Sequence, residues 1–338
     1  MYTPKSLWTW SFILLSIVQA AIVIGFESYV FAVFQTEAFK IPETDNPDSA
    51  ENQRPQTIPT YLTLFIFGFL YQIVLAYDAL RLKNTIQIIG LCFYNLALLI
   101  YGAVQIDQIK DAVVEDDKVW GKTHPFLVAI PCVVALITVV MSGVAWKLYD
   151  EFAWTIYKHI SADLRMKRRF LTYQIYIALL KFDFFFFLGF TVQFVVIVLG
   201  KARDKEFYIT IAAIPVTILI LVLAAYWTRT ENRFGMALIL SLYVCGLAYF
   251  SFKLGRMYDG KQRVKYRYSR KSLTTFAVIT LILLFLTIVN ACVCTYNFGR
   301  GLKPHIARRK LENEDEKATT ELPNYGYGQA MPSRMTID

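Results

Sequence analysis

The sequence predicts an all-α, polytopic transmembrane helix bundle that crosses a bilayer seven or eight times. Of the 338 residues, 56% are hydrophobic and only 18% are charged. A soluble domain averages roughly 45–50% apolar and about 25% charged residues. The mean hydropathy of +0.42 agrees with this excess of apolar residues. A soluble fold would leave much of this apolar surface in water, so we expect a membrane protein.

The apolar residues are also grouped into long runs. A helix needs about 20 mostly apolar residues to cross a hydrocarbon core of about 30 Å, and it satisfies its own backbone hydrogen bonds, as lipid requires. Eight stretches meet or approach that length within a membrane domain of residues 1–298. The predicted spans are residues 7–34, 60–80, 85–106, 124–146, 172–199, 207–227, 234–252 and 272–296.

The first stretch begins like a signal peptide, with Lys5, an apolar run and small residues that end at Ala20. A cleaved leader has a short apolar core of about 7–15 residues. Here the apolar character continues to Phe34. We therefore expect a retained first span.

The charges of the loops bear on topology. Residues 36–59 and 107–123 form acidic loops, whereas residues 147–170 are basic. Since positive charge marks the cytosolic side, the first half predicts a cytosolic N-terminus. Residues 253–271 carry eight basic residues and one acid, and they fall on the other side if all eight stretches cross. In a seven-span alternative, a segment between Phe207 and Phe252 does not cross.

Residues 148–170 place apolar side chains four residues apart and end in a basic cluster. This pattern predicts a helix lying on the cytosolic membrane surface, with a helical extension of the neighbouring spans as the alternative. The apolar residues are Leu148, Phe152, Ile156, Ile160 and Leu164, and the basic residues are Arg165, Lys167, Arg168 and Arg169.

The last segment, residues 299–338, is polar and predicts a disordered tail. Its basic part includes Arg308, Arg309 and Lys310. We expect these residues to bind the anionic headgroups of the bilayer. The basic segments could also hold partner membrane proteins.

The fifth predicted span carries two charged residues, Lys181 and Asp183. Nine residues from Thr172 at about 1.5 Å each place Lys181 about 14 Å deep, near the middle of the membrane. Each central charge costs about 2.5–3.5 kcal/mol on insertion scales. The two side chains project about 200° apart on a helix, so we expect each to need a separate partner.

Seven-residue spacing places Gln174 on the face of Lys181 and Tyr176 on the face of Asp183. A helix with two polar faces belongs inside a bundle. The candidate partners in other spans are Glu27, Asp78, Gln19, Gln72, Asn95 and Asn290. One hypothesis is a proton or ion relay, or a midplane site for a small solute or lipid headgroup. The alternative is that the polar pairs only fix the register of the helices.

Catalytic and cofactor motifs are scarce. His124, His159 and His305 are scattered, without the spacing of a metal-dependent hydrolase. We expect no metal and no cofactor. The net charge of +9 lies in short runs beside the apolar segments, so we expect no nucleic-acid partner. The five cysteines lie in or at the edges of apolar segments, which argues against a disulfide framework.

Residues 162–194 read ADLRMKRRFLTYQIYIALLKFDFFFFLGFTVQF. This stretch, with its KFDFFFF segment and basic lead-in, resembles an uncharacterised family of fungal Golgi apparatus multi-pass membrane proteins. The similarity extends over roughly residues 7–298. The resemblance implies a multi-pass protein of the Golgi or a nearby endomembrane, and it implies no activity.

The residues favour a non-enzymatic membrane protein that binds or moves a small solute, ion or lipid headgroup through a polar site, and the resemblance implies that it lies in an endomembrane. A trafficking or scaffold protein that holds partner proteins or lipids through its basic cytosolic segments is the alternative. An integral-membrane enzyme ranks third, because no catalytic motif was found.

Overall fold

The computed structural model describes residues 6–38, 54–113, 117–159, 164–198, 205–258 and 270–299. The regular elements within these ranges are helices. In chain order they are α1 (Leu7–Ala38), α2 (Arg54–Arg81), α3 (Thr85–Val113), α4 (Asp117–His159), α5 (Leu164–Gln193), the π-helical turn η2 (Phe194–Val198), α6 (Lys205–Thr230), α7 (Arg233–Tyr258) and α8 (Arg270–Tyr296).

All eight α-helices are long and apolar enough to cross a membrane. Each predicted span falls within one of them, except that the fifth runs into η2 and its residue 199 lies outside the described residues. Helices α6 and α7 both qualify as spans. They cover the segment that the seven-span alternative leaves out of the membrane, so the fold has eight candidate spans.

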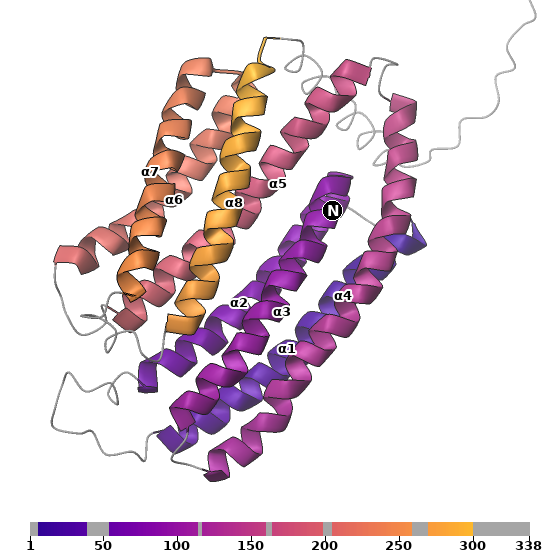
Figure 1. Ribbon diagram of the computed structural model, residues 1–338. Helices are drawn as coiled ribbons and strands as arrows, with labels where there is room; N and C mark the ends of the chain where they lie inside the picture. Colours follow the sequence, from indigo (N-terminus) through magenta and orange to yellow (C-terminus); the bar gives the residue numbers. More distant parts are fainter. Residues whose placement is uncertain are drawn as a thin grey trace, which may run out of the picture.

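The helices form two rings of four (Figure 1). In the first half, α1 to α4, each helix packs against its neighbours in sequence and α4 closes the ring against α1. The second half, α5 to α8, repeats this order, with α8 closing against α5. The two halves meet where α3 packs against α5 and α8, and where α2 packs against α5 and η2.

Two tight turns of the same geometry connect α2 to α3 and α6 to α7. Lys83 and Glu231 adopt φ values of 49° and 55° and end the helix before them. Asn84 Oδ1 then accepts the backbone N–H groups of residues 86 and 87 at 3.2 and 3.3 Å. Asn232 Oδ1 accepts those of residues 234 and 235 at 3.1 and 3.3 Å. Both asparagines are N-caps, which satisfy donors that the first helical turn leaves unpaired.

The two faces of the bundle can be followed through contacts near the helix ends. We call the face where α1, α3, α5 and α7 begin the N-terminal face. There Ser6 Oγ donates to Glu151 Oε2 near the end of α4, at 2.7 Å. On the opposite face, Lys271 at the start of α8 forms an ion pair with Asp107 of α3 at 3.7 Å. The described ends of the basic segment 253–271 therefore lie on the opposite face, as eight crossings require.

Aromatic side chains and glycines make the contact between the halves. Phe185 and Phe186 of α5 are buried and lie with their ring centroids 5.1 and 5.9 Å from that of Tyr94 on α3. Gly90 lets the Phe182 ring approach so closely that an added Cβ would lie 2.5 Å from it. The apolar run of α5 therefore packs in the protein interior.

The outer surface is apolar. Large hydrophobic side chains are exposed along the spans, including Leu14, Val74, Phe93, Val139, Leu219, Phe252 and Phe285. Exposed apolar surface of this extent is unfavourable in water. These side chains contact the hydrocarbon of the bilayer.

The structure shows the alternative predicted for residues 148–170, a helical extension of the neighbouring spans, in place of a separate surface helix. Residues 148–159 continue α4, and α5 begins at Leu164. The reason is that Leu148 and Phe152 are buried in the core, so their four-residue spacing marks the interior face of a span. Arg165 and Arg168 are exposed at the start of α5, and Lys167 and Arg169 are half-buried there. Arg308, Arg309, Lys310 and the rest of the tail beyond residue 299 lie outside the described residues.

Candidate functional site

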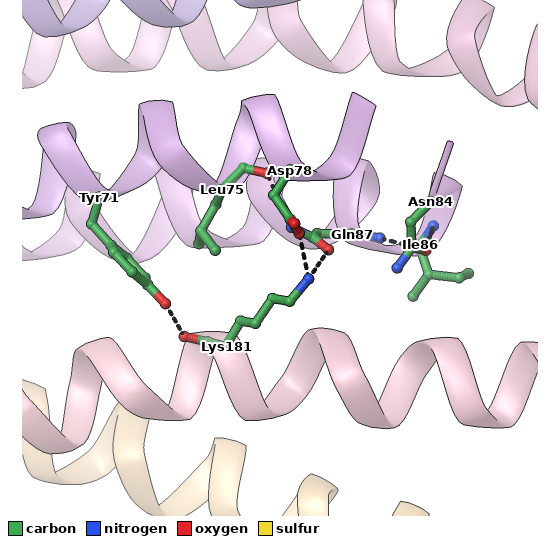
Figure 2. Close-up of polar contacts among 7 residues, drawn as sticks. All are labelled: Tyr71, Leu75, Asp78, Asn84, Ile86, Gln87 and Lys181. Carbon is green, nitrogen blue, oxygen red and sulfur yellow. Dashed lines mark hydrogen bonds and ion pairs between the residues drawn. The ribbon is translucent and has the colours of Figure 1, made fainter. Parts of the chain in front are cut away.

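Lys181 joins the two halves through a polar cluster (Figure 2). Its ammonium forms an ion pair with Asp78 of α2 and donates to Gln87 Oε1 of α3 at 2.9 Å. Gln87 Nε2 donates to Asp78 Oδ2 at 3.0 Å. The Tyr71 hydroxyl donates to the Lys181 carbonyl at 2.8 Å. Two helices of the first half, α2 and α3, therefore hold the cation that α5 carries.

The position of Asp78 corrects the predicted depth of the Lys181 charge. Asp78 lies three residues before the end of α2 at Arg81, which is about 4.5 Å along the helix. The Lys181 and Asp78 side chains are 25% and 35% exposed. Because a lysine side chain is long and apolar up to its ammonium, it carries the charge from its backbone toward the N-terminal face.

Asp183 is held differently. Its Oδ2 accepts the Thr287 hydroxyl of α8 at 2.6 Å. Its Oδ1 has no hydrogen-bond partner among the described residues, and the residue is only 1% exposed. Lys181 and Asp183 thus have separate partners, as their spacing predicted. The Tyr176 and Tyr243 hydroxyls lie 3.3 Å apart, with Tyr176 seven residues before Asp183 on α5.

A second carboxyl is buried in the first half. Glu27 of α1 is fully buried, and its two oxygens accept Gln105 Nε2 at 3.2 and 3.3 Å. Gln105 Oε1 has no hydrogen-bond partner. No described lysine or arginine pairs with Glu27. Like Asp183, this carboxyl is held by one neutral side chain.

The predicted site residues do not form one cluster. Asn95 belongs to an amide cluster in the first half, where it and Gln72 both bond to Gln19. Gln174 is buried, but no hydrogen bond joins it to the Lys181 pair. Tyr176 lies two turns before Asp183 on α5, and its hydroxyl meets that of Tyr243.

Several partners were not predicted, namely Gln87, Gln105, Tyr243 and Thr287. They are neutral polar residues, which occur in spans without special meaning. The seven-residue spacing of Thr280, Thr287 and Cys294 was the available signal, because it places three polar groups on one face of α8. All three are buried.

Within the described ranges, no three histidine, cysteine or acidic side chains cluster as metal ligands. Among the described residues, the polar interior also contains buried oxygens that accept no hydrogen bond. Its buried oxygens without a donor include Gln72 Oε1, Gln105 Oε1 and Asp183 Oδ1. Such an interior suits a group that brings positive charge or donates hydrogen bonds.

Comparison with known proteins places the chain in a family. No family model matches it, and neither does any solved structure. A UPF0658 Golgi apparatus membrane protein of Schizosaccharomyces pombe is 35% identical over 325 residues, which cover 87% of this chain and 88% of the relative. The relative supports the resemblance in the sequence and, with the eight candidate spans, a multi-pass topology. The chain belongs to the UPF0658 family of Golgi apparatus membrane proteins and is a multi-pass protein of the Golgi membrane.

Proposed function

We propose that this protein is a non-enzymatic carrier that binds and moves a small solute, ion or lipid headgroup through the polar interior of its bundle. One observation carries the proposal. Glu27 and Asp183 are buried carboxyls, each held by one neutral side chain, and neither has a basic partner in the described parts of the chain.

The observation is informative because a buried charge without a partner is energetically unfavourable. A carboxylate deep in a membrane protein is costly unless a proton, a cation or a water-filled cavity compensates it, and such residues mark substrate or ion pathways. The Lys181 ammonium does not serve this purpose, because Asp78 already pairs with it. A cargo that is cationic or rich in hydrogen-bond donors would satisfy the carboxyls and the donor-free oxygens together.

The two carboxyls also lie in different halves. Glu27 is on α1 and Asp183 is on α5, the first helix of each ring. Along its span, Glu27 lies nine residues from the end at Thr36, or about 14 Å. Asp183 lies 13 residues from the end of its span at Val196, or about 20 Å. A cargo that passes through the interior in stages needs polar groups at more than one depth, and the two carboxyls would provide them.

Native mass spectrometry of the gently solubilised protein tests the proposal. We expect wild type to retain a small molecule, ion or lipid that Glu27→Gln and Asp183→Asn lose. Asp107→Asn is the matched control, because it makes the same chemical change at an exposed carboxyl on the opposite face.

Spectra with no small species in any variant would contradict the carrier. If a protein partner is then present in every sample, the scaffold alternative gains support. Deleting residues 300–338 and finding that partner lost would assign the interaction to the basic tail segment.

A further inference from the structure

The carboxyl of Asp183 lies in the second half with a single hydrogen-bond donor. We propose that Asp183 is a proton-binding site, that it holds its proton as a neutral carboxylic acid, and that this proton exchanges with the N-terminal face. The ligand is thus a proton. The use of this proton in moving cargo rests on the proposed function, whereas the presence of the proton on Asp183 does not.

The surroundings of the carboxyl suit a proton better than a metal cation. Thr287 is the hydroxyl that reaches Oδ2, at 2.6 Å. The neighbouring Thr280 and Thr295 of α8 instead donate to backbone carbonyls one turn earlier. Calcium and magnesium take about six or more oxygen ligands. A proton needs only the oxygen that carries it, and Oδ1 lacks any donor that would stabilise a negative charge.

The charged and titratable groups on the surrounding helices leave no cation for Asp183. Several of these groups already have a polar partner other than Asp183. Lys181 pairs with Asp78, and Arg229 donates to the Tyr173 hydroxyl. The Tyr94 hydroxyl donates to the Gly68 carbonyl, and the Tyr176 hydroxyl meets that of Tyr243. Lys253 of α7 lies over the Phe194 ring at 4.1 Å, and Cys294 of α8 donates to the Thr172 carbonyl at 3.7 Å. Since a neutral acid costs much less to bury than an unpaired carboxylate, the proton remains on Asp183.

Polar groups lead from Asp183 toward the N-terminal face. Tyr176 lies seven residues earlier on α5, or about 10 Å in that direction, and its hydroxyl meets that of Tyr243. Farther along, Asn290 Nδ2 donates to the Thr172 carbonyl at 3.1 Å. The two tyrosine hydroxyls can each accept and donate a proton, and the Asn290 contact keeps this side of the helix packing polar.

Toward the opposite face the surroundings are aromatic. Phe187 and Phe190 follow Asp183 on α5, and their ring centroids lie 5.3 and 5.0 Å from that of Phe250 on α7. All three side chains are buried. These three rings border Asp183 on the side of α7, while the buried Thr280 of α8 lies toward the opposite face from Thr287.

Infrared spectroscopy of the full chain in lipid nanodiscs tests the site without any cargo. A protonated carboxylic acid has a carbonyl stretching band that a carboxylate lacks. We expect Asp183→Asn to lose one such band from the wild-type spectrum and Glu27→Gln to leave that band in place. Identical carbonyl bands in wild type and Asp183→Asn would show that Asp183 is ionised and would overturn the proposal.

Two further variants keep the carboxyl and cover the case in which Asp183→Asn does not fold. Thr287→Val removes the donor to Oδ2, so we expect the band to shift in frequency, and an unshifted band would contradict the site. Tyr243→Phe removes one of the two tyrosine hydroxyls. We expect it to slow the deuterium exchange of the band at least several-fold, and an unchanged exchange rate would overturn the route.

If the band behaves as expected but no cargo is found by mass spectrometry, the proton site stands and the carrier proposal fails. If a cargo is lost from Asp183→Asn while the carbonyl bands are unchanged, the carrier stands and the proton site fails.

Discussion

The two four-helix halves share their packing order and their central turn but differ in their polar interiors. In both halves a turn that contains Arg-x-x-Asn ends one helix and caps the next, at residues 81–84 and 229–232. The first half contains an amide cluster in which Gln19 bonds to Gln72 and Asn95, and Asn95 reaches Met141 of α4 at 3.2 Å. That cluster touches all four helices of its ring.

The second half has no such amide cluster among its described residues. Its buried polar groups near Asp183 are mainly the hydroxyls of Thr287, Tyr176 and Tyr243. A hydroxyl donates one hydrogen bond, whereas an amide NH₂ donates two. The comparison teaches that an amide cluster links all four helices of the first half, whereas the described residues of the second half contain no equivalent link. We therefore expect the first half to serve as the scaffold and the second as the responsive part.

The largest effect is expected where the halves are joined by charge. Lys181→Met leaves Asp78 without its cation, and we expect a loss of about 3 kcal/mol of stability. This is the lower end of the range for a broken buried pair, because both side chains are partly exposed. Thermal unfolding in detergent measures it. Lys181→Met combined with Asp78→Leu should recover most of the loss, and a double variant as unstable as the single one would contradict this account.

A smaller effect is expected at the aromatic contact between the halves. Gly90→Ala places a Cβ 2.5 Å from the Phe182 ring, which stacks on Tyr94 and has little room to move. Overpacking of this kind costs about 1–3 kcal/mol. The control is Gly25→Ala, since a Cβ there meets nothing within 4 Å. Equal unfolding temperatures for the two variants would show that the halves are not closely packed at Gly90.

The repeated turn should give equal effects in the two halves. Asn84→Ala and Asn232→Ala each remove an N-cap, at an expected cost of about 1 kcal/mol. Substitution by aspartate keeps the capping oxygen and should restore most of the stability in each case. A marked difference between the two alanine variants would break the equivalence of the turns.

The smallest effect is expected at the ion pair between Lys271 and Asp107. The side chains are 48% and 69% exposed at the surface of the protein. Exposed pairs contribute roughly 0.2–1 kcal/mol, so Lys271→Met should change the unfolding temperature little. A loss as large as that of Lys181→Met would mean that the halves are joined equally strongly at both faces.

Hydropathy was sufficient to predict the spans, because a bilayer imposes the same length and composition on each of them. Helical spacing was sufficient to predict that Lys181 and Asp183 need different partners. It did not identify those partners. The choice of Asp78 for Lys181 depends on where the α2–α3 turn lies against α5, which is a result of packing between distant segments.

The segment from residue 148 shows a second limit. Leu148 and Phe152 lie on one helical face whether that face meets lipid or protein, and the spacing alone does not distinguish the two. Their burial against the core made the segment part of α4. Thr287 shows a third limit, because a threonine in a span usually bonds to its own helix and only the neighbour on α5 reveals its different role.

The pairing of Asp78 with Lys181 also bears on biosynthesis. The first ring can close around its amide cluster as soon as α4 has left the ribosome, since all members of that cluster lie on α1 to α4. Asp78 remains without its cation until α5 is made. The Asp78 carboxylate is therefore already present in the membrane when Lys181 of α5 is inserted. We therefore expect the first ring to form first and the second to dock on it through this ion pair.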